Sequence, residues 1–157
     1  MSVLRWEYND GGRSGAGFKG DAGDCVTRSI AIATGLPYLE VYNDLFDRNR
    51  SFMMSSRTRE AKRLRSSTKG ATPRDGVIKT VYKPYLESLG WTWTPTMQIG
   101  QGCKVHMRAD ELPPGRLIVS CSKHLVAVID GVVHDTHDPS REGTRCVYGY
   151  WSEGETP

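Results

Sequence analysis

The sequence lacks any long apolar run of the kind that a membrane span or a secretory signal requires. No hydrophobic stretch approaches the roughly 20 consecutive residues needed to cross a bilayer, and the opening MSVLRWEYNDGG has no apolar core. A phosphate-cradling loop and a dinucleotide fingerprint are also absent from the sequence. We therefore expect a cytoplasmic protein that contacts no membrane and needs no organic cofactor.

A large excess of one charge is missing as well, because 21 Lys and Arg face 18 Asp and Glu, which leaves a net charge of +3. So mild a charge does not by itself predict a nucleic-acid partner. The length of 157 residues, with 38% hydrophobic and 25% charged residues, suits one globular domain over residues 1–157. The sequence does not determine the oligomeric state.

Cysteine is sparse, and the four cysteines are Cys25, Cys103, Cys121 and Cys146. An intracellular domain of this length does not need disulfides to fold. We therefore interpret all four as free thiols, and the question becomes which of them is reactive.

The first half of the chain has the pattern of loops and helices. Six glycines in thirteen positions predict an irregular loop over residues 11–23. Asp24 is then a good N-cap for a helix over residues 25–34. Further helices are predicted over residues 37–47 and over residues 75–90. Asp75 is the expected N-cap of the second of these.

Residues 48–74 differ in composition from the rest of the chain. They carry nine Lys or Arg against a single acid, Glu60, and few large apolar residues. Such a segment is either a solvated helical excursion or a mobile insertion.

The second half of the chain has the pattern of strands. Asp130-Gly131 between apolar flanks is a strong signal for a two-residue hairpin turn. Helices first and antiparallel strands second are the order of an α+β fold. The extended segments are residues 91–94, 117–120, 124–129, 132–135 and 146–151, followed by a tail over residues 152–157.

Cys25 is the best candidate for a reactive thiol. It follows the predicted cap Asp24 and a glycine-rich loop, so it falls in the first turn of a helix. Free backbone N–H groups and the positive end of the helix dipole stabilise a thiolate there, and the same N–H groups can face an oxyanion. Cys121 and Cys146 lie in apolar, strand-like runs typical of core cysteines, and a buried core position is also the alternative for Cys25.

The predicted hairpin brings a histidine and an acid together. If Ile129 pairs with Val132 across the turn, His124 and Asp135 lie on one face of the sheet as diagonal neighbours. A carboxylate there fixes the imidazole and leaves its second nitrogen free to take a proton from a thiol. His137 and Asp138 compete for this orienting role, and a register slip of one residue would bring Asp138 to the same face.

The order Cys, His, Asp along the chain resembles that of the papain-like cysteine peptidases. The pair Asp24-Cys25 and the stretch from Pro113 to Gly131 are similar to small bacterial and phage members, among them the peptidases that process bacteriocin leaders. The chain more closely resembles a family of short bacterial and phage proteins of this fold. The similar segments are GDCVTRSIAIATG, YLESLGW, GCKVH, ELPPGRLIVS, HLVAVIDGVVHDTHD and RCVYGYW.

This resemblance implies a papain-like α+β fold, with N-terminal helices packed on a C-terminal antiparallel sheet. It implies a cofactor-free, metal-free cysteine hydrolase (a peptidase or amidase) with Cys25 as nucleophile, His124 as general base and acid, and Asp135 as the orienting carboxylate. The backbone N–H of Cys25 is then one oxyanion donor. Papain-like enzymes usually place a Gln six positions before the cysteine as the second donor, and Lys19 holds that position here.

Two other classes of protein compete with this hypothesis. A structural zinc site is one, because Cys103 with His106 and Cys121 with His124 repeat a Cys-x2-His spacing. The other is a degenerate papain-like binding protein, whose basic segment over residues 48–74 contacts nucleic acid or an acidic partner. That segment lacks the interleaved aromatic residues that stack on bases, which argues against a nucleic-acid partner. The resemblance implies a peptide or amide substrate instead.

Overall fold

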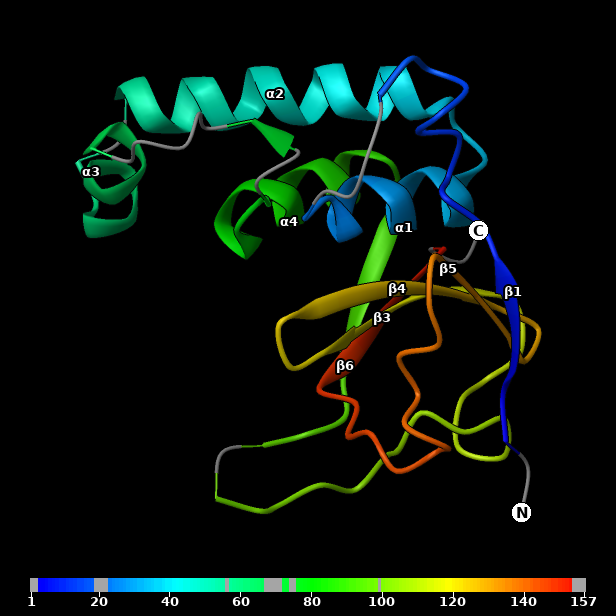
Figure 1. Cartoon of the computed structure of the whole chain (residues 1–157). Helices are drawn as coiled ribbons and strands as arrows, with labels where there is room; N and C mark the ends of the chain where they lie inside the picture. The colour runs from blue at the N-terminus through cyan, green and yellow to red at the C-terminus, as the bar shows by residue number, and fades with distance from the viewer. Residues whose placement is uncertain are drawn as a thin grey trace.

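The computed structural model describes residues 3–18, 23–55, 57–66, 72–73, 76–98 and 100–153. Its centre is a six-stranded mixed sheet with the strand order β1-β5-β4-β3-β6-β2 (Figure 1). The strands are β1 (Arg5–Tyr8), β2 (Trp91–Pro95), β3 (Arg116–Cys121), β4 (His124–Ile129), β5 (Val132–Asp135) and β6 (Gly149–Glu153). All neighbouring strands run antiparallel except β1, which pairs in parallel with β5.

The described part of the chain contains four helices, which lie on one side of the sheet (Figure 1). Helix α1 packs on β3, β4 and β5, and α4 contacts β2. Helix α2 covers α1 and α4, and α3 extends from its far end. Their bounds are Cys25–Thr34 for α1, Tyr38–Ser55 for α2, Arg59–Ser66 for α3 and Lys79–Ser88 for α4.

Apolar side chains from both faces of the sheet form the core. Ile118 and Ala127 point into the cluster beneath the helices, whereas Val119 and Val126 belong to a second cluster on the opposite side. Loops between β2 and β3 and between β5 and β6 cover that second side (Figure 1). Because both faces are buried, β3 and β4 are continuous apolar runs without the alternation of a half-exposed strand.

Several sequence predictions are confirmed. Cys25 begins α1, the mixture of helices and strands is observed, and Ile129 pairs with Val132 across the Asp130-Gly131 turn. Positive φ angles of 47° at Asp130 and 79° at Gly131 fit this turn.

Other predictions are wrong. The chain does not place all strands after the helices, because β1 precedes them and makes the sheet mixed. The tail predicted over residues 152–157 begins later, since β6 continues to Glu153. The basic segment over residues 48–74 is helical where it is described, because α2 extends to Ser55 and α3 follows.

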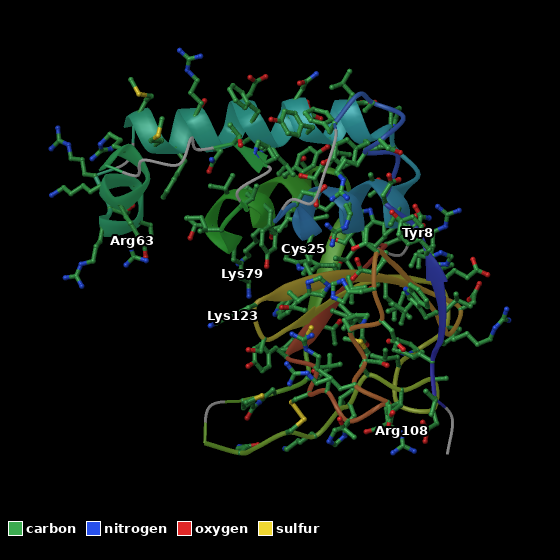
Figure 2. The ribbon with its side chains drawn as sticks, in the orientation of Figure 1. Tyr8, Cys25, Arg63, Lys79, Arg108 and Lys123 are labelled. Carbon is green, nitrogen blue, oxygen red and sulfur yellow. A yellow bond between two sulfur atoms is a disulfide. The ribbon has the colours of Figure 1, made fainter. Side chains whose placement is uncertain are left out.

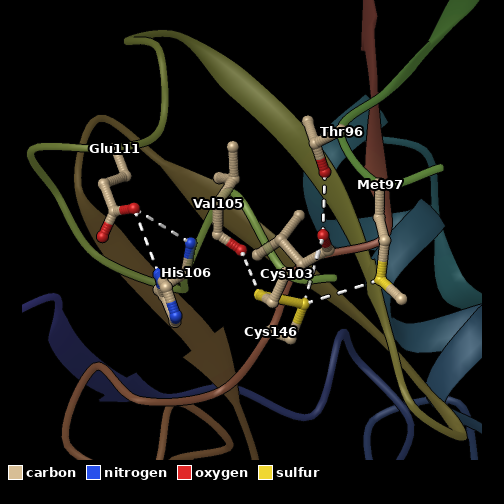
Figure 3. The surroundings of a disulfide bond; sticks show 8 residues. Thr96, Met97, Cys103, Val105, His106, Glu111 and Cys146 are labelled. Atoms are coloured by element: carbon tan, nitrogen blue, oxygen red, sulfur yellow. Dashed lines mark hydrogen bonds and ion pairs between the residues drawn. A yellow bond between two sulfur atoms is a disulfide. The ribbon is translucent and has the colours of Figure 1, made fainter. Parts of the chain in front are cut away.

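A disulfide joins Cys103 to Cys146, so the prediction of four free thiols is wrong (Figure 3). Two segments that are distant in sequence run side by side here, and Val147 donates its N–H to the Val105 carbonyl over 2.8 Å. This pairing brings the two Cα atoms to 5.9 Å, a normal disulfide separation. Cys25 and Cys121 are the free cysteines.

No described helix combines the length and the apolar character that crossing a membrane requires.

Candidate functional site

The thiol of Cys25 lies at the N-terminus of α1, on the side of the helical layer that faces the sheet (Figure 2). The prediction that Asp24 caps this helix through its side chain is wrong. Its carboxylate makes no cap hydrogen bond and instead accepts bonds from other side chains. The first-turn N–H groups of α1 therefore do not bind that carboxylate, and their partial positive charge lies next to the Cys25 sulfur.

His124 links Cys25 to Asp135. The Nε2 atom of His124 lies 2.7 Å from Oδ2 of Asp135, and the imidazole also hydrogen-bonds to the Cys25 thiol. Because Nε2 is engaged by the carboxylate, Nδ1 is the atom left for the sulfur. The predicted meeting of His124 and Asp135 on the hairpin is confirmed, and the structure adds Cys25 to the same hydrogen-bonded chain.

The Cys25 thiol, the His124 imidazole and the Asp135 carboxylate each favour the charged form of their neighbour. Burial by itself raises the pKa of the Cys25 thiol, but the hydrogen bond and charge of His124, together with Arg28, bring it below its usual value. Burial opposes the imidazolium of His124, yet its contacts with Asp135 and Cys25 raise its pKa to about 9. This arrangement favours the ionised form of the Cys25 thiol beside a protonated His124.

The second free cysteine has the opposite character. Burial is the main reason why the pKa of Cys121 is raised to about 11. Cys121 accordingly remains a neutral thiol at neutral pH, which fits the predicted core role.

A buried arginine, Arg28, forms an ion pair with Asp135. Arg28 is 5% exposed and places one guanidinium nitrogen 3.0 Å from Oδ1 of Asp135. Its other terminal nitrogen contacts the fully buried carboxylate of Asp24, which also accepts from Arg13 at 2.9 Å and from the Tyr38 hydroxyl at 2.6 Å. Although burial raises the pKa of Asp135, His124 and Arg28 hold it below its ordinary value.

Sequence reasoning missed this network. Its only local signal is the four-residue spacing of Asp24 and Arg28, which allows a helical ion pair but is usually found on exposed surfaces. The link from Arg28 to Asp135 spans 107 residues and depends on the packing of α1 on the sheet.

The alternative acid, Asp138, does not take the orienting position. It is exposed, and its Oδ1 atom accepts the backbone N–H of Ser140 at 3.0 Å, which closes a turn. His137, the other competitor for the orienting role, lies closer to the site, because its ring centroid is 5.2 Å from that of His124. Lys19, the predicted second oxyanion donor, lies outside the described residues.

The zinc site considered from the sequence is contradicted, because Cys103 is bonded to Cys146. Among the described residues, His124, Asp135 and His137 offer ligand atoms that lie within 4.8 Å of one another. Both oxygens of Asp135 already accept hydrogen bonds, and the guanidinium of Arg28 lies beside them. A divalent cation would be repelled by that guanidinium, so this grouping suits an acid–base site better than a metal site.

A cavity of about 580 Å³ opens beside the thiol. Its walls come from the starts of α1 and α4 and from the hairpin between β3 and β4, and they include Cys25, His124, Tyr82 and Ser120. Such a volume is within the range of pockets that enclose small ligands. A thiol, an imidazole and a ligand-sized space therefore occur together.

None of the family models, curated proteins or solved structures compared with the chain matches it. The geometry of the site therefore carries the functional argument.

Proposed function

We propose that the protein is a cysteine hydrolase of papain-like fold, a peptidase or amidase that works through a thioester on Cys25. The observation that carries the proposal is the hydrogen-bonded chain Cys25–His124–Asp135 at the edge of a ligand-sized cavity. A helix that begins with the cysteine and packs on antiparallel strands bearing the histidine and the acid supports the papain-like assignment.

The acylation step follows from these positions. The Cys25 thiolate attacks the carbonyl carbon of the scissile amide, and the oxygen becomes an oxyanion near the N-terminus of α1. The His124 imidazolium then gives its proton to the leaving amine as the carbon–nitrogen bond breaks, which leaves a thioester on Cys25 and a neutral imidazole.

The deacylation step restores the starting state. The neutral imidazole takes a proton from a water molecule, whose hydroxide attacks the thioester carbon. The carbon–sulfur bond breaks, the carboxylic acid leaves, and the thiolate–imidazolium pair returns. Asp135 holds the ring of His124 in place in both steps, because its carboxylate accepts from Nε2 while Nδ1 serves the sulfur.

The competing binding-protein hypothesis depends on the basic segment. Most of the described exposed cations of this segment lie on α3 or just before it, with Arg50 on α2, and Figure 2 shows Arg63 at the α3 end of the helical layer, away from Cys25. No described residue of the segment lines the cavity, and a role in contacting nucleic acid or an acidic partner stays a prediction from the sequence.

Acyl transfer from p-nitrophenyl acetate tests the proposed chemistry without knowledge of the natural substrate. We expect a burst of p-nitrophenol, an acetyl group on Cys25 by peptide mass mapping, and slow loss of that group as water attacks. Cys25→Ala should give no burst, whereas Cys121→Ala should behave as wild type because its thiol has a raised pKa. Acetylation spread over surface lysines with none on Cys25 would contradict the proposal.

A further inference from the structure

The cavity next to Cys25 is lined by cations and by no described carboxylate. Two helices, α1 and α4, begin at it, and their N-termini contribute partial positive charge. Among the described lining residues there is no Asp or Glu. The charged and titratable basic residues of the lining are Arg28, Lys79, Lys123, His124 and His137.

The two lysines differ from Arg28 in how their charge is balanced. Arg28 is buried between Asp24 and Asp135, so its charge is offset within the protein. Within the part of the chain that the structure describes, neither Lys79 nor Lys123 has a carboxylate at ion-pairing distance. Both side chains are exposed, so their charge remains available to a ligand.

Each lysine is held at the rim by a local feature. Lys79 is the first residue of α4, and its Nζ atom lies 4.2 Å from the centroid of the Trp93 ring, a cation–π contact. Lys123 lies in the tight turn between β3 and β4 with a positive φ of 56°, directly before His124. Figure 2 shows the two on the same side of the molecule, near Cys25.

We propose that this cavity recognises a carboxylate carried by the substrate beside the scissile bond, which makes acidic peptides the substrate class. The inference rests on the proposed function and adds to it a binding role for Lys79 and Lys123. A carboxylate held between two ammonium groups brings the neighbouring carbonyl carbon close to the sulfur of Cys25. The same lysines disfavour substrates with a cation at that position.

Competing alkylation of Cys25 by iodoacetate and iodoacetamide tests the inference. The two reagents differ in charge, and iodoacetate carries its carboxylate next to the carbon that reacts. At low ionic strength we expect the ratio of the iodoacetate rate to the iodoacetamide rate to fall roughly fivefold in the double variant Lys79→Gln/Lys123→Gln. The ratio in wild type should also fall as salt is added, because these charges are exposed.

The matched control is Lys83→Gln/Lys104→Gln, which removes the same charge from exposed lysines outside the cavity lining. Its ratio should stay close to that of wild type. An equal ratio in wild type and in the cavity variant would overturn the anion-binding inference, even if Cys25 alkylates rapidly as the hydrolase proposal requires. Slow alkylation by both reagents, with a ratio that still depends on the cavity lysines, would keep anion binding by these lysines but remove the hydrolase, and with it the acidic-peptide substrate.

Discussion

His124→Ala is expected to slow the alkylation of Cys25 by iodoacetamide at pH 6 by about 100-fold. Only the thiolate attacks the reagent, and in the wild-type protein the hydrogen bond and charge of His124 keep the pKa of Cys25 low. Without the imidazole, burial still opposes ionisation of the thiol, and only the weaker effects of Arg28 and a backbone hydrogen bond favour it. The thiol then ionises near or above its ordinary pKa, so little thiolate is present at pH 6.

The rate is measured by mass spectrometry of the Cys25 peptide at short times, and His106→Ala is the matched control. His106 is a half-buried histidine that contacts Glu111 and lies outside the cavity lining. Its loss should leave the rate of Cys25 alkylation unchanged. A slowing of less than about threefold in His124→Ala would mean that the imidazole does not ionise the thiol.

Arg28→Met is expected to lower the free energy of unfolding at pH 7 by about 3–5 kcal/mol. The substitution removes the cation that two buried carboxylates share, Asp24 on the same helix and Asp135 on the sheet. Remaining partners, such as Tyr38 on Asp24 and His124 on Asp135, supply hydrogen bonds but replace only part of the lost attraction. Urea unfolding followed by circular dichroism measures the loss.

The exposed Arg50 on α2 offers a matched control, because Arg50→Met changes the same group at the surface. Its cost should stay within about 0.5 kcal/mol. The loss in the free energy of unfolding caused by Arg28→Met should also be smaller at acidic pH. The pKa of Asp135 is lowered in the folded state, so the stability that its charge contributes is present above its unfolded value and lost as the pH falls. A cost that is small at pH 7, or equal at pH 3 and pH 7, would show that Arg28 does not stabilise these carboxylates.

The part of the site that could be predicted from sequence is the part that local rules determine. A two-residue turn at Asp130-Gly131 fixes the register of β4 and β5, and the register alone brings His124 to Asp135. The place of Cys25 at a helix start follows from the change of period after the glycine-rich loop. These features need only short-range pattern and backbone geometry.

The missing parts depend on contacts between distant segments. The local sequence indicates only that Arg28 is a charged residue on a short helix. The packing of α1 on the sheet buries it beside Asp135. The disulfide between Cys103 and Cys146 requires two loops to pair across 43 residues, which no local pattern reveals. Strand β1 has four exposed residues and joins the sheet at its edge, so it lacks the apolar run by which strands are recognised.

The central claim is that Cys25 and His124 form a thiolate–imidazolium pair, and the pH dependence of thiolate absorbance at about 240 nm tests it most directly. The difference between wild type and Cys25→Ser isolates the signal of Cys25, because Cys121 contributes equally to both. We predict that the thiolate signal of Cys25 titrates at lower pH than that of an ordinary cysteine, because the hydrogen bond and charge of His124 lower the pKa of this thiol, and the pKa of His124 is raised to about 9. A thiolate that appears only above about pH 8.5, as in an ordinary cysteine, would contradict the pair and with it the proposed hydrolase.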